Sequence, residues 1–115
     1  MTQYSRGYAF EQTIAGQLRQ DGYFCVRSGG SHGVADVVAL KPGQVLLIQA
    51  KIDGEISAAE WNELYAIAER LGAVPLLAWR PKRGVLEYRR LTGLRVVRGE
   101  RPSQVWTADE VAVGG

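Results

Sequence analysis

The sequence predicts an α/β or α+β fold in which a mixed β-sheet is flanked by helices, and three observations support this. The 115-residue chain is 46% hydrophobic and 23% charged, which is typical of one globular domain with a packed core. Segments with apolar residues at helical spacing alternate with short runs rich in β-branched and aromatic residues. Their order is helix, three strands, helix, strand, so we expect a single domain spanning residues 1–115.

The first half of the chain contains one predicted helix and three predicted strands. The helix lies between an N-cap at Ser5 and a stop at Gly22, and its apolar stripe consists of Phe10, Ile14 and Leu18. Strands are predicted over residues 23–27, 35–40 and 45–51. The turn residues 41–44 (KPGQ) join the last two strands, which should therefore form a hairpin.

The second helix has the clearest start signal in the chain. Ser57 and Glu60 form a capping box, and Ile56 and Trp61 occupy the positions of a hydrophobic staple. Gly72 ends the helix. Strands are then predicted over 74–79 and 85–91, and we expect 94–98 to continue the sheet. The proline at position 75 should lie at a strand start or on a sheet edge.

Composition excludes several classes of protein. One cysteine and one histidine exclude an intrachain disulfide and a Cys/His zinc site, so any metal must be held by oxygen ligands. No apolar run approaches the roughly 18 residues that span a bilayer, and the first residues lack the apolar stretch of a signal peptide. We therefore expect a cytoplasmic protein with no membrane partner.

Positive charge is concentrated in residues 80–101. This segment carries eight basic side chains against two acidic ones, whereas residues 52–79 carry one basic side chain against five acidic ones. Eleven of the fourteen basic residues in the chain are arginine, whose planar guanidinium can bind two phosphate oxygens at once. The pattern favours a phosphate-containing partner, and a solvated, heat-tolerant surface is the alternative.

The predicted hairpin brings three polar side chains together in an apolar setting. If residue 40 pairs with residue 45, Asp36 faces Gln49, and Lys51 points to the same side as Gln49. Buried charges need partners, so an Asp36–Lys51 salt bridge is one explanation. It does not explain why Gln49 lies between the two charges.

These residues carry a resemblance to a known family. GlyValAlaAspVal at 33–37 followed by IleGlnAlaLys at 48–51 resembles the PD-(D/E)xK nuclease motif, in which an aspartate on one strand and an acid-x-lysine on the next hold Mg²⁺. Glu11 in the first helix, Arg27 and Ser31 before the motif aspartate, and the helix and strand after Lys51 are similar to the archaeal-type Holliday junction resolvases. The resemblance covers residues 5–91. It implies a restriction-endonuclease-like α/β fold with core order α-β-β-β-α-β.

The resemblance implies a Mg²⁺-dependent endonuclease, with Mn²⁺ able to substitute, that resolves four-way DNA junctions by paired phosphodiester hydrolysis. The implied metal ligands are Asp36, Gln49, the carbonyl of Ala50 and the nearby Glu11. Lys51 would orient the attacking water or stabilise charge in the transition state. The sequence departs from the family at Gln49, where an acid is expected, because an amide oxygen can bind a cation but adds no negative charge. The implied catalytic residues are Glu11, Ser31, Asp36, Gln49 and Lys51.

The same resemblance implies contacts with branched DNA and a second copy of the chain. The candidate DNA-binding residues are Arg6, Arg27, Ser31, His32, Arg80, Lys82 and Arg83. Paired nicks on opposite strands require two active sites, so we expect a homodimer. Leu77, Trp79 and the strand from Val85 are the candidate interface.

Two other functions fit the same residues. A related nuclease could act on ordinary duplex DNA, and a non-catalytic DNA-binding module could retain a decayed site marked by Gln49. A small-molecule-binding domain is disfavoured because the sequence has no glycine-rich phosphate loop.

Overall fold

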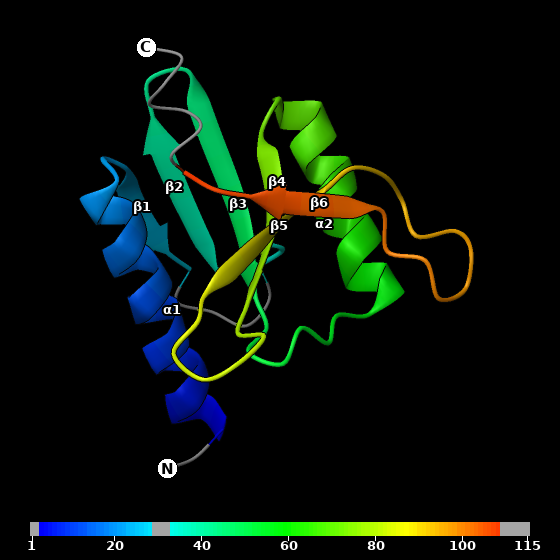
Figure 1. Cartoon of the computed structure of the whole chain (residues 1–115). Helices are drawn as coiled ribbons and strands as arrows, with labels where there is room; N and C mark the ends of the chain where they lie inside the picture. Colours follow the sequence, from blue (N-terminus) through cyan, green and yellow to red (C-terminus); the bar gives the residue numbers. More distant parts are fainter. Residues whose placement is uncertain (1–2, 29–32, 109–115) are drawn as a thin grey trace.

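The apolar patterns of the sequence build two helices and six strands in the part of the chain that the structure describes, residues 3–28 and 33–108 (Figure 1). This structure is a computed structural model. The helices are α1 (Gln3–Gln20) and α2 (Ala58–Leu71). The strands are β1 (Phe24–Arg27), β2 (Val37–Lys41), β3 (Gln44–Ala50), β4 (Val74–Trp79), β5 (Glu87–Leu91) and β6 (Ser103–Trp106).

All six strands belong to one sheet, in the order β1-β2-β3-β4-β5-β6. The only parallel pair among these strands is β3 with β4, and α2 makes the long connection that a parallel pair requires. The predicted mixed sheet and the order α-β-β-β-α-β are confirmed, with β5 and β6 following. None of the described helices is both long and apolar enough to span a membrane.

The two helices pack on opposite faces of the sheet, and side chains along β3 alternate between them. Leu46 and Ile48 are fully buried in the cluster that contains the apolar stripe of α1. Leu47 belongs to the cluster under α2, together with Trp61 and Leu64. Because successive strand residues face opposite sides, Gln49 lies on the α2 side of the sheet.

The predicted start and end of α2 are confirmed. Ser57 is the N-cap, its side chain accepts a hydrogen bond from Glu60 N, and the Glu60 side chain accepts one from Ser57 N. Ile56 and Trp61 are both buried in the same cluster. Gly72 ends the helix in the left-handed conformation, at φ 66°.

Several predicted boundaries are wrong by one or two residues. The first helix begins at Gln3, ahead of the predicted N-cap Ser5. β1 begins one residue later than predicted, β2 is shifted to Val37–Lys41, and β5 begins at Glu87. The strand predicted over 45–51 covers Gln44–Ala50. The proline at position 75 is the second residue of an inner strand and precedes the first pair with β5, so it lies at the strand start, one of its two predicted positions.

The strand predicted over 94–98 is wrong. In this segment, the backbone of Arg95 bonds the side-chain amide of Asn62 instead of a neighbouring strand, with N to Oδ1 at 2.7 Å and Asn62 Nδ2 to O at 3.2 Å. The last strand among the described residues is β6, which pairs with β5 and packs Trp106 edge-to-face against Tyr88, with ring centroids 5.6 Å apart. The interface prediction for Leu77 is also wrong, because this side chain is only 1% exposed in the core under α2.

Candidate active site

Asp36 and Gln49 meet at the open end of the β2–β3 hairpin, as the sequence predicted. The hairpin pairs Leu40 with Val45 and Val37 with Ile48, and this register places Asp36 opposite Gln49. Asp36 lies just before β2, and its Oδ2 accepts a hydrogen bond from Ala50 N at 2.8 Å. The aspartate side chain thus replaces a backbone partner at the end of β3, which fixes its carboxylate beside the strand terminus.

The electrostatic setting of Asp36 favours its neutral form. Burial raises the pKa of Asp36 above the ordinary value of 3.8, although the Ala50 hydrogen bond and the charge of Lys51 oppose this shift. The negative charge of Glu60 adds to the increase. Partly buried carboxyl groups with raised pKa values are typical of functional sites. A cation bound beside Asp36 would favour its ionised form.

Lys51 lies directly after β3 and does not pair with Asp36. Its Nζ is 3.0 Å from Glu60 Oε2, in the first turn of α2, so the alternative of an Asp36–Lys51 salt bridge is wrong. Burial alone would raise the pKa of Glu60, but hydrogen bonds from Lys51 and Ser57 outweigh it, and this pKa is lowered. Glu60 is thus an ionised partner of Lys51, a contact that sequence reasoning did not predict.

Glu11 and Arg27 form a second ion pair at the site. Arg27 Nη2 donates to Glu11 Oε1 at 2.9 Å, which joins α1 to the end of β1, and both side chains are about one-fifth exposed, at 21% and 20%. Burial raises the pKa of Glu11, the Arg27 hydrogen bond lowers it, and the nearby charge of Asp36 raises it further. The guanidinium of Arg27 also stacks over the Tyr8 ring, 4.2 Å from its centroid. Tyr8 was not identified from the sequence.

Two buried polar atoms beside this pair lack a protein partner in the described part of the chain. They are Nε of Arg27 and Oγ of Ser28, the residue that follows β1. Buried polar groups are normally hydrogen-bonded, so these atoms are available to a ligand oxygen or a water molecule. Sequence reasoning selected Ser31 instead of Ser28, and both Ser31 and His32 lie outside the described residues.

The oxygen atoms at the hairpin end suit a hard divalent cation. The side chain of Gln49 is 8% exposed and makes no hydrogen bond among the described residues, and Asp36 uses only one of its two carboxylate oxygens. The described residues hold no group of three or more Asp, Glu, His or Cys side chains arranged for a metal. The available donors are therefore one carboxylate, one amide oxygen and the Ala50 carbonyl, a set that fits Mg²⁺ together with several waters.

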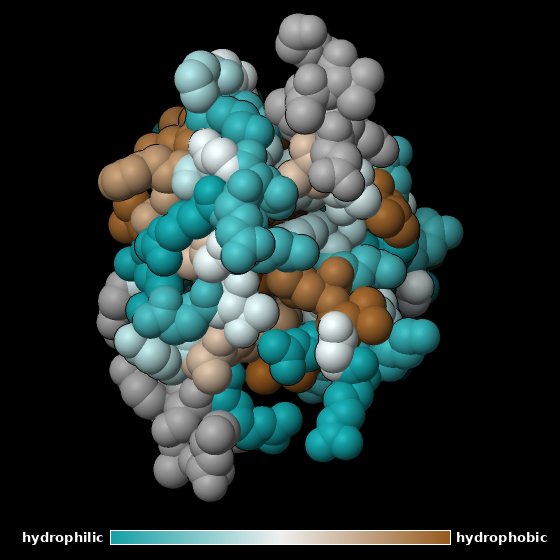
Figure 2. Space-filling view, turned by 60° about the vertical axis from the view of Figure 1, so that its left-hand side comes forward, coloured by the Kyte–Doolittle hydropathy of each residue, from teal (hydrophilic) through white to brown (hydrophobic). Residues whose placement is uncertain are grey.

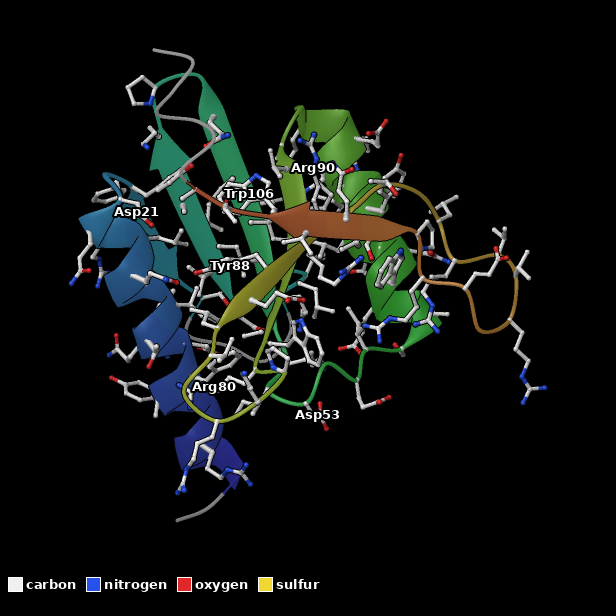
Figure 3. All side chains as sticks on the ribbon, viewed as in Figure 1. Asp21, Asp53, Arg80, Tyr88, Arg90 and Trp106 are labelled. Carbon is white, nitrogen blue, oxygen red and sulfur yellow. The ribbon has the colours of Figure 1, made fainter. Side chains whose placement is uncertain are left out.

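Basic side chains of the segment 80–101 lie at more than one place on the sheet (Figure 3). Arg80 follows β4, its N donates to Ile52 O at 2.9 Å, and its guanidinium lies over the ring of Phe10 in α1, 5.1 Å from its centroid. Figure 3 shows Arg80 beside α1 and Arg90 near the opposite end of the sheet. Three further basic candidates are exposed: Arg6, Lys82 and Arg83.

Comparisons with known proteins agree with this geometry. The model of the family described as archaeal Holliday junction resolvase (Hjc) matches residues 2–103. The chain is 32% identical over 79 residues to a crossover junction endodeoxyribonuclease Hjc of Methanocaldococcus jannaschii, and this match covers 65% of this chain and 59% of the relative. The fold matches the solved structure of Archaeoglobus fulgidus Hjc, described as a Holliday junction resolvase from an archaeal hyperthermophile, with a TM-score of 0.70 and 24% identity over 94% of this chain and 96% of that one. Since the family model covers nearly the whole sequence, the chain belongs to the archaeal Holliday junction resolvase family.

Proposed function

We propose that this protein is a divalent-metal-dependent endonuclease that resolves four-way DNA junctions by hydrolysing one phosphodiester on each of two opposing strands. The observation that carries the proposal is the meeting of Asp36 and Gln49 at the hairpin end, with Lys51 and the Glu11–Arg27 pair beside them. Membership of the resolvase family supports the same activity. The M. jannaschii relative, which carries the name of a crossover junction endodeoxyribonuclease, agrees with it.

The metal in this proposal is Mg²⁺, with Mn²⁺ able to substitute. Asp36, Gln49 and the Ala50 carbonyl would hold it, and Glu11 lies near enough to Asp36 to add its negative charge. A bound divalent cation supplies Lewis-acid activation of a water molecule and stabilises negative charge on the phosphate.

The side chains around the metal ligands have separate tasks in this proposal. Lys51 carries a positive charge at the end of β3, where it orients the attacking water or stabilises the charge that develops on the phosphate. Nε of Arg27 and the hydroxyl of Ser28, which have no hydrogen-bond partner among the described residues, would bind a phosphate oxygen. The contacts with phosphates further along the DNA are assigned to Arg6, Ser31, His32, Arg80, Lys82 and Arg83.

A second copy of the chain completes the proposed enzyme, because paired nicks need two active sites in one complex. Phe24 and Val26 on the edge strand β1 and Leu40 on β2 are exposed by 68%, 46% and 37%. Phe24 pairs with Leu40, and Val26 pairs with Val38, so these side chains share one face of the sheet. Figure 2 shows hydrophobic side chains reaching the surface in patches between hydrophilic ones. We assign the dimer interface to this face, defined by Phe24, Val26 and Leu40, and not to Trp79 or Val85, whose side chains are less exposed.

The proposal is tested by incubating the purified protein with a labelled four-way junction and a matched linear duplex, with and without Mg²⁺. Symmetric nicks in the junction alone, only in the presence of the metal, are the expected result. Equal cutting of both DNAs would identify a duplex nuclease instead. Junction binding without cleavage under any divalent cation would identify a non-catalytic DNA-binding module in which Gln49 marks a decayed site.

A further inference from the structure

The ammonium of Lys51 is held by a residue outside the nuclease motif. Its Nζ lies 3.0 Å from Oε2 of Glu60, and the two side chains are 28% and 43% exposed. Glu60 belongs to the first turn of α2, so this contact joins the end of β3 to the start of the helix on the same face of the sheet. The direction in which Lys51 points is therefore set by α2.

Both oxygens of the Glu60 carboxylate are engaged. Oε1 accepts hydrogen bonds from Ser57 N at 3.2 Å and from Ser57 Oγ at 3.1 Å, while Oε2 accepts the bond from Lys51. The lysine side chain is long and flexible, and a partner fixed in this way reduces the number of positions that its ammonium can adopt. The capping box of α2 thus serves a second purpose at the end of β3.

The start of α2 is itself anchored in the core. Ile56 and Trp61 on either side of the capping box are 7% and 0% exposed, and Trp61 Nε1 donates to Gly93 O at 2.9 Å. A carboxylate carried by this segment keeps its place relative to the sheet. Preorganised charges of this kind are more effective in catalysis than charges that must move into position.

Glu60 also supplies a negative charge close to position 49, where the nuclease motif of this chain lacks one. Gln49 is neutral, and it lies two residues before Lys51 on the same face of β3. The charge of Glu60 is close enough to act on Asp36 as well as on Lys51. The ammonium therefore has a carboxylate partner even though position 49 provides none.

We propose that Glu60 is a positioning residue for Lys51, which holds the ammonium at the site and supplies the negative charge that Gln49 does not. The inference rests on the proposed nuclease function. A positioning role differs from a purely structural role in capping α2. If Glu60 positions Lys51, removing its charge lowers the rate of the chemical step, whereas a capping role alone predicts a loss of stability.

The test measures single-turnover cleavage of a junction in Mg²⁺ and junction affinity in the absence of divalent cations. Glu60→Gln keeps an oxygen that can accept from Ser57 N but loses the charge that holds Lys51. We expect the cleavage rate to fall about two- to fivefold, as for the loss of one exposed ion pair, with the junction Kd unchanged. Wild-type cleavage in this variant would overturn the inference, whereas a wild-type protein that binds junctions without cleaving them would instead overturn the proposed function.

Two control variants distinguish the positioning of Lys51 from a general effect of charge and from a loss of helix stability. Glu63→Gln removes the same charge from an exposed position one turn along α2, and Ala59→Gly weakens the same first turn without touching Lys51. Both should cleave at the wild-type rate at a temperature well below their melting points. If Ala59→Gly loses as much rate as Glu60→Gln, the role of Glu60 is only structural and the inference fails.

A compensating variant tests the charge directly. Introducing Gln49→Glu into the Glu60→Gln protein returns a carboxylate to the face of β3 that carries Lys51, so we expect cleavage to recover at least part of the lost rate. If Gln49→Glu alone is active but the double variant recovers none of the lost rate, the claim that Glu60 replaces the charge missing at position 49 is contradicted.

Discussion

At the scale of single residues, Asp36 connects the sheet to the proposed metal site. Its Oδ2 closes the end of β3 through Ala50 N at 2.8 Å, and its partial burial raises its pKa. A carboxyl whose pKa is higher in the folded than in the unfolded protein favours the fold most at low pH. Its contribution is lost as the pH rises through the folded-state pKa. The ionised form of Asp36 therefore lowers the free energy of unfolding at the pH values at which it would bind a cation.

Asp36→Asn tests both consequences. The amide can still accept from Ala50 N but can neither ionise nor neutralise a cation, so we expect cleavage to fall by about 100-fold or more while junction binding is kept. Chemical denaturation should show the wild type losing stability relative to the variant as the pH rises from about 4, the ordinary pKa of aspartate. Parallel stability curves for the two proteins would contradict the assigned burial of the Asp36 charge.

Gln49→Glu tests the assignment of the amide oxygen as a ligand. A carboxylate at this buried position adds a negative charge beside Asp36, so we expect a lower Mg²⁺ concentration for half-maximal cleavage. A titration of cleavage rate against Mg²⁺ measures this value. An unchanged metal requirement, with full activity in Gln49→Ala, would remove Gln49 from the site.

At the scale of elements, sequence patterns predicted the features that depend on interactions between residues close together in the sequence. The capping box at Ser57 and the hairpin turn at 41–44 depend on neighbours in sequence, and the structure confirms both. The register of this hairpin was enough to bring Asp36 opposite Gln49. The position of Asn62 against Arg95, however, depends on the packing of distant segments, so the sequence pattern of residues 94–98 wrongly predicted a strand.

The same limit applies to the partners of the site residues. Glu60 was recognised as a cap, but its contact with Lys51 requires knowing where α2 begins relative to the end of β3. The Glu11–Arg27 pair depends on the packing of α1 against the sheet. The sequence pattern could predict these residues as a set, and only the tertiary arrangement shows which of them pair.

Gly54, in the loop between β3 and α2, provides a prediction about this loop. Its φ is 78°, and an added Cβ would lie 2.8 Å from Cε3 of Trp79. Gly54→Ala should therefore destabilise the protein through both backbone strain and a clash, by about 2–5 kcal/mol in urea denaturation. Gly43→Ala is the matched control, because its φ is 76° and no heavy atom lies within 4 Å of the added Cβ. Equal losses in the two variants would show that Trp79 moves aside without cost.

At the scale of the whole molecule, the basic side chains near Arg80 should determine how junction binding depends on salt. Each neutralised phosphate contributes about −0.9 to the slope of log affinity against log salt. Lys82→Glu with Arg83→Glu should therefore reduce the slope by about 1.8 if both contact DNA. Both side chains are exposed, so folding should be preserved.

A control that reverses a single charge elsewhere lies in the loop between β5 and β6, which projects on the side away from α1 (Figure 1). Arg98→Glu reverses an exposed charge there and should leave the slope unchanged. A slope that changes as much per reversed charge for Arg98 as for the Lys82–Arg83 pair would indicate binding by overall charge rather than by a defined surface.

The dimer interface that we propose at Phe24, Val26 and Leu40 would determine whether two active sites act on one junction. A stable two-fold interface buries about 1,200–2,000 Å² in total, and an exposed apolar face on an edge strand is suited to a second copy of itself. Phe24 is 68% exposed, so Phe24→Asp should leave the monomer folded while placing two charges in the interface. Analytical ultracentrifugation at micromolar concentration should show a wild-type dimer and a monomeric variant.

Junction selectivity should be lost together with the dimer. Two basic surfaces held at a fixed separation can contact several arms of a junction at once, but only one stretch of a linear duplex, so the preference is an avidity effect rather than a result of base contacts. Competition binding should therefore show that Phe24→Asp binds junction and duplex with similar affinity. Val105→Asp, at a 55% exposed position on the opposite edge strand β6, should keep both the dimer and the selectivity. A monomeric wild type, or full selectivity in monomeric Phe24→Asp, would show that recognition of the branch point lies within a single chain.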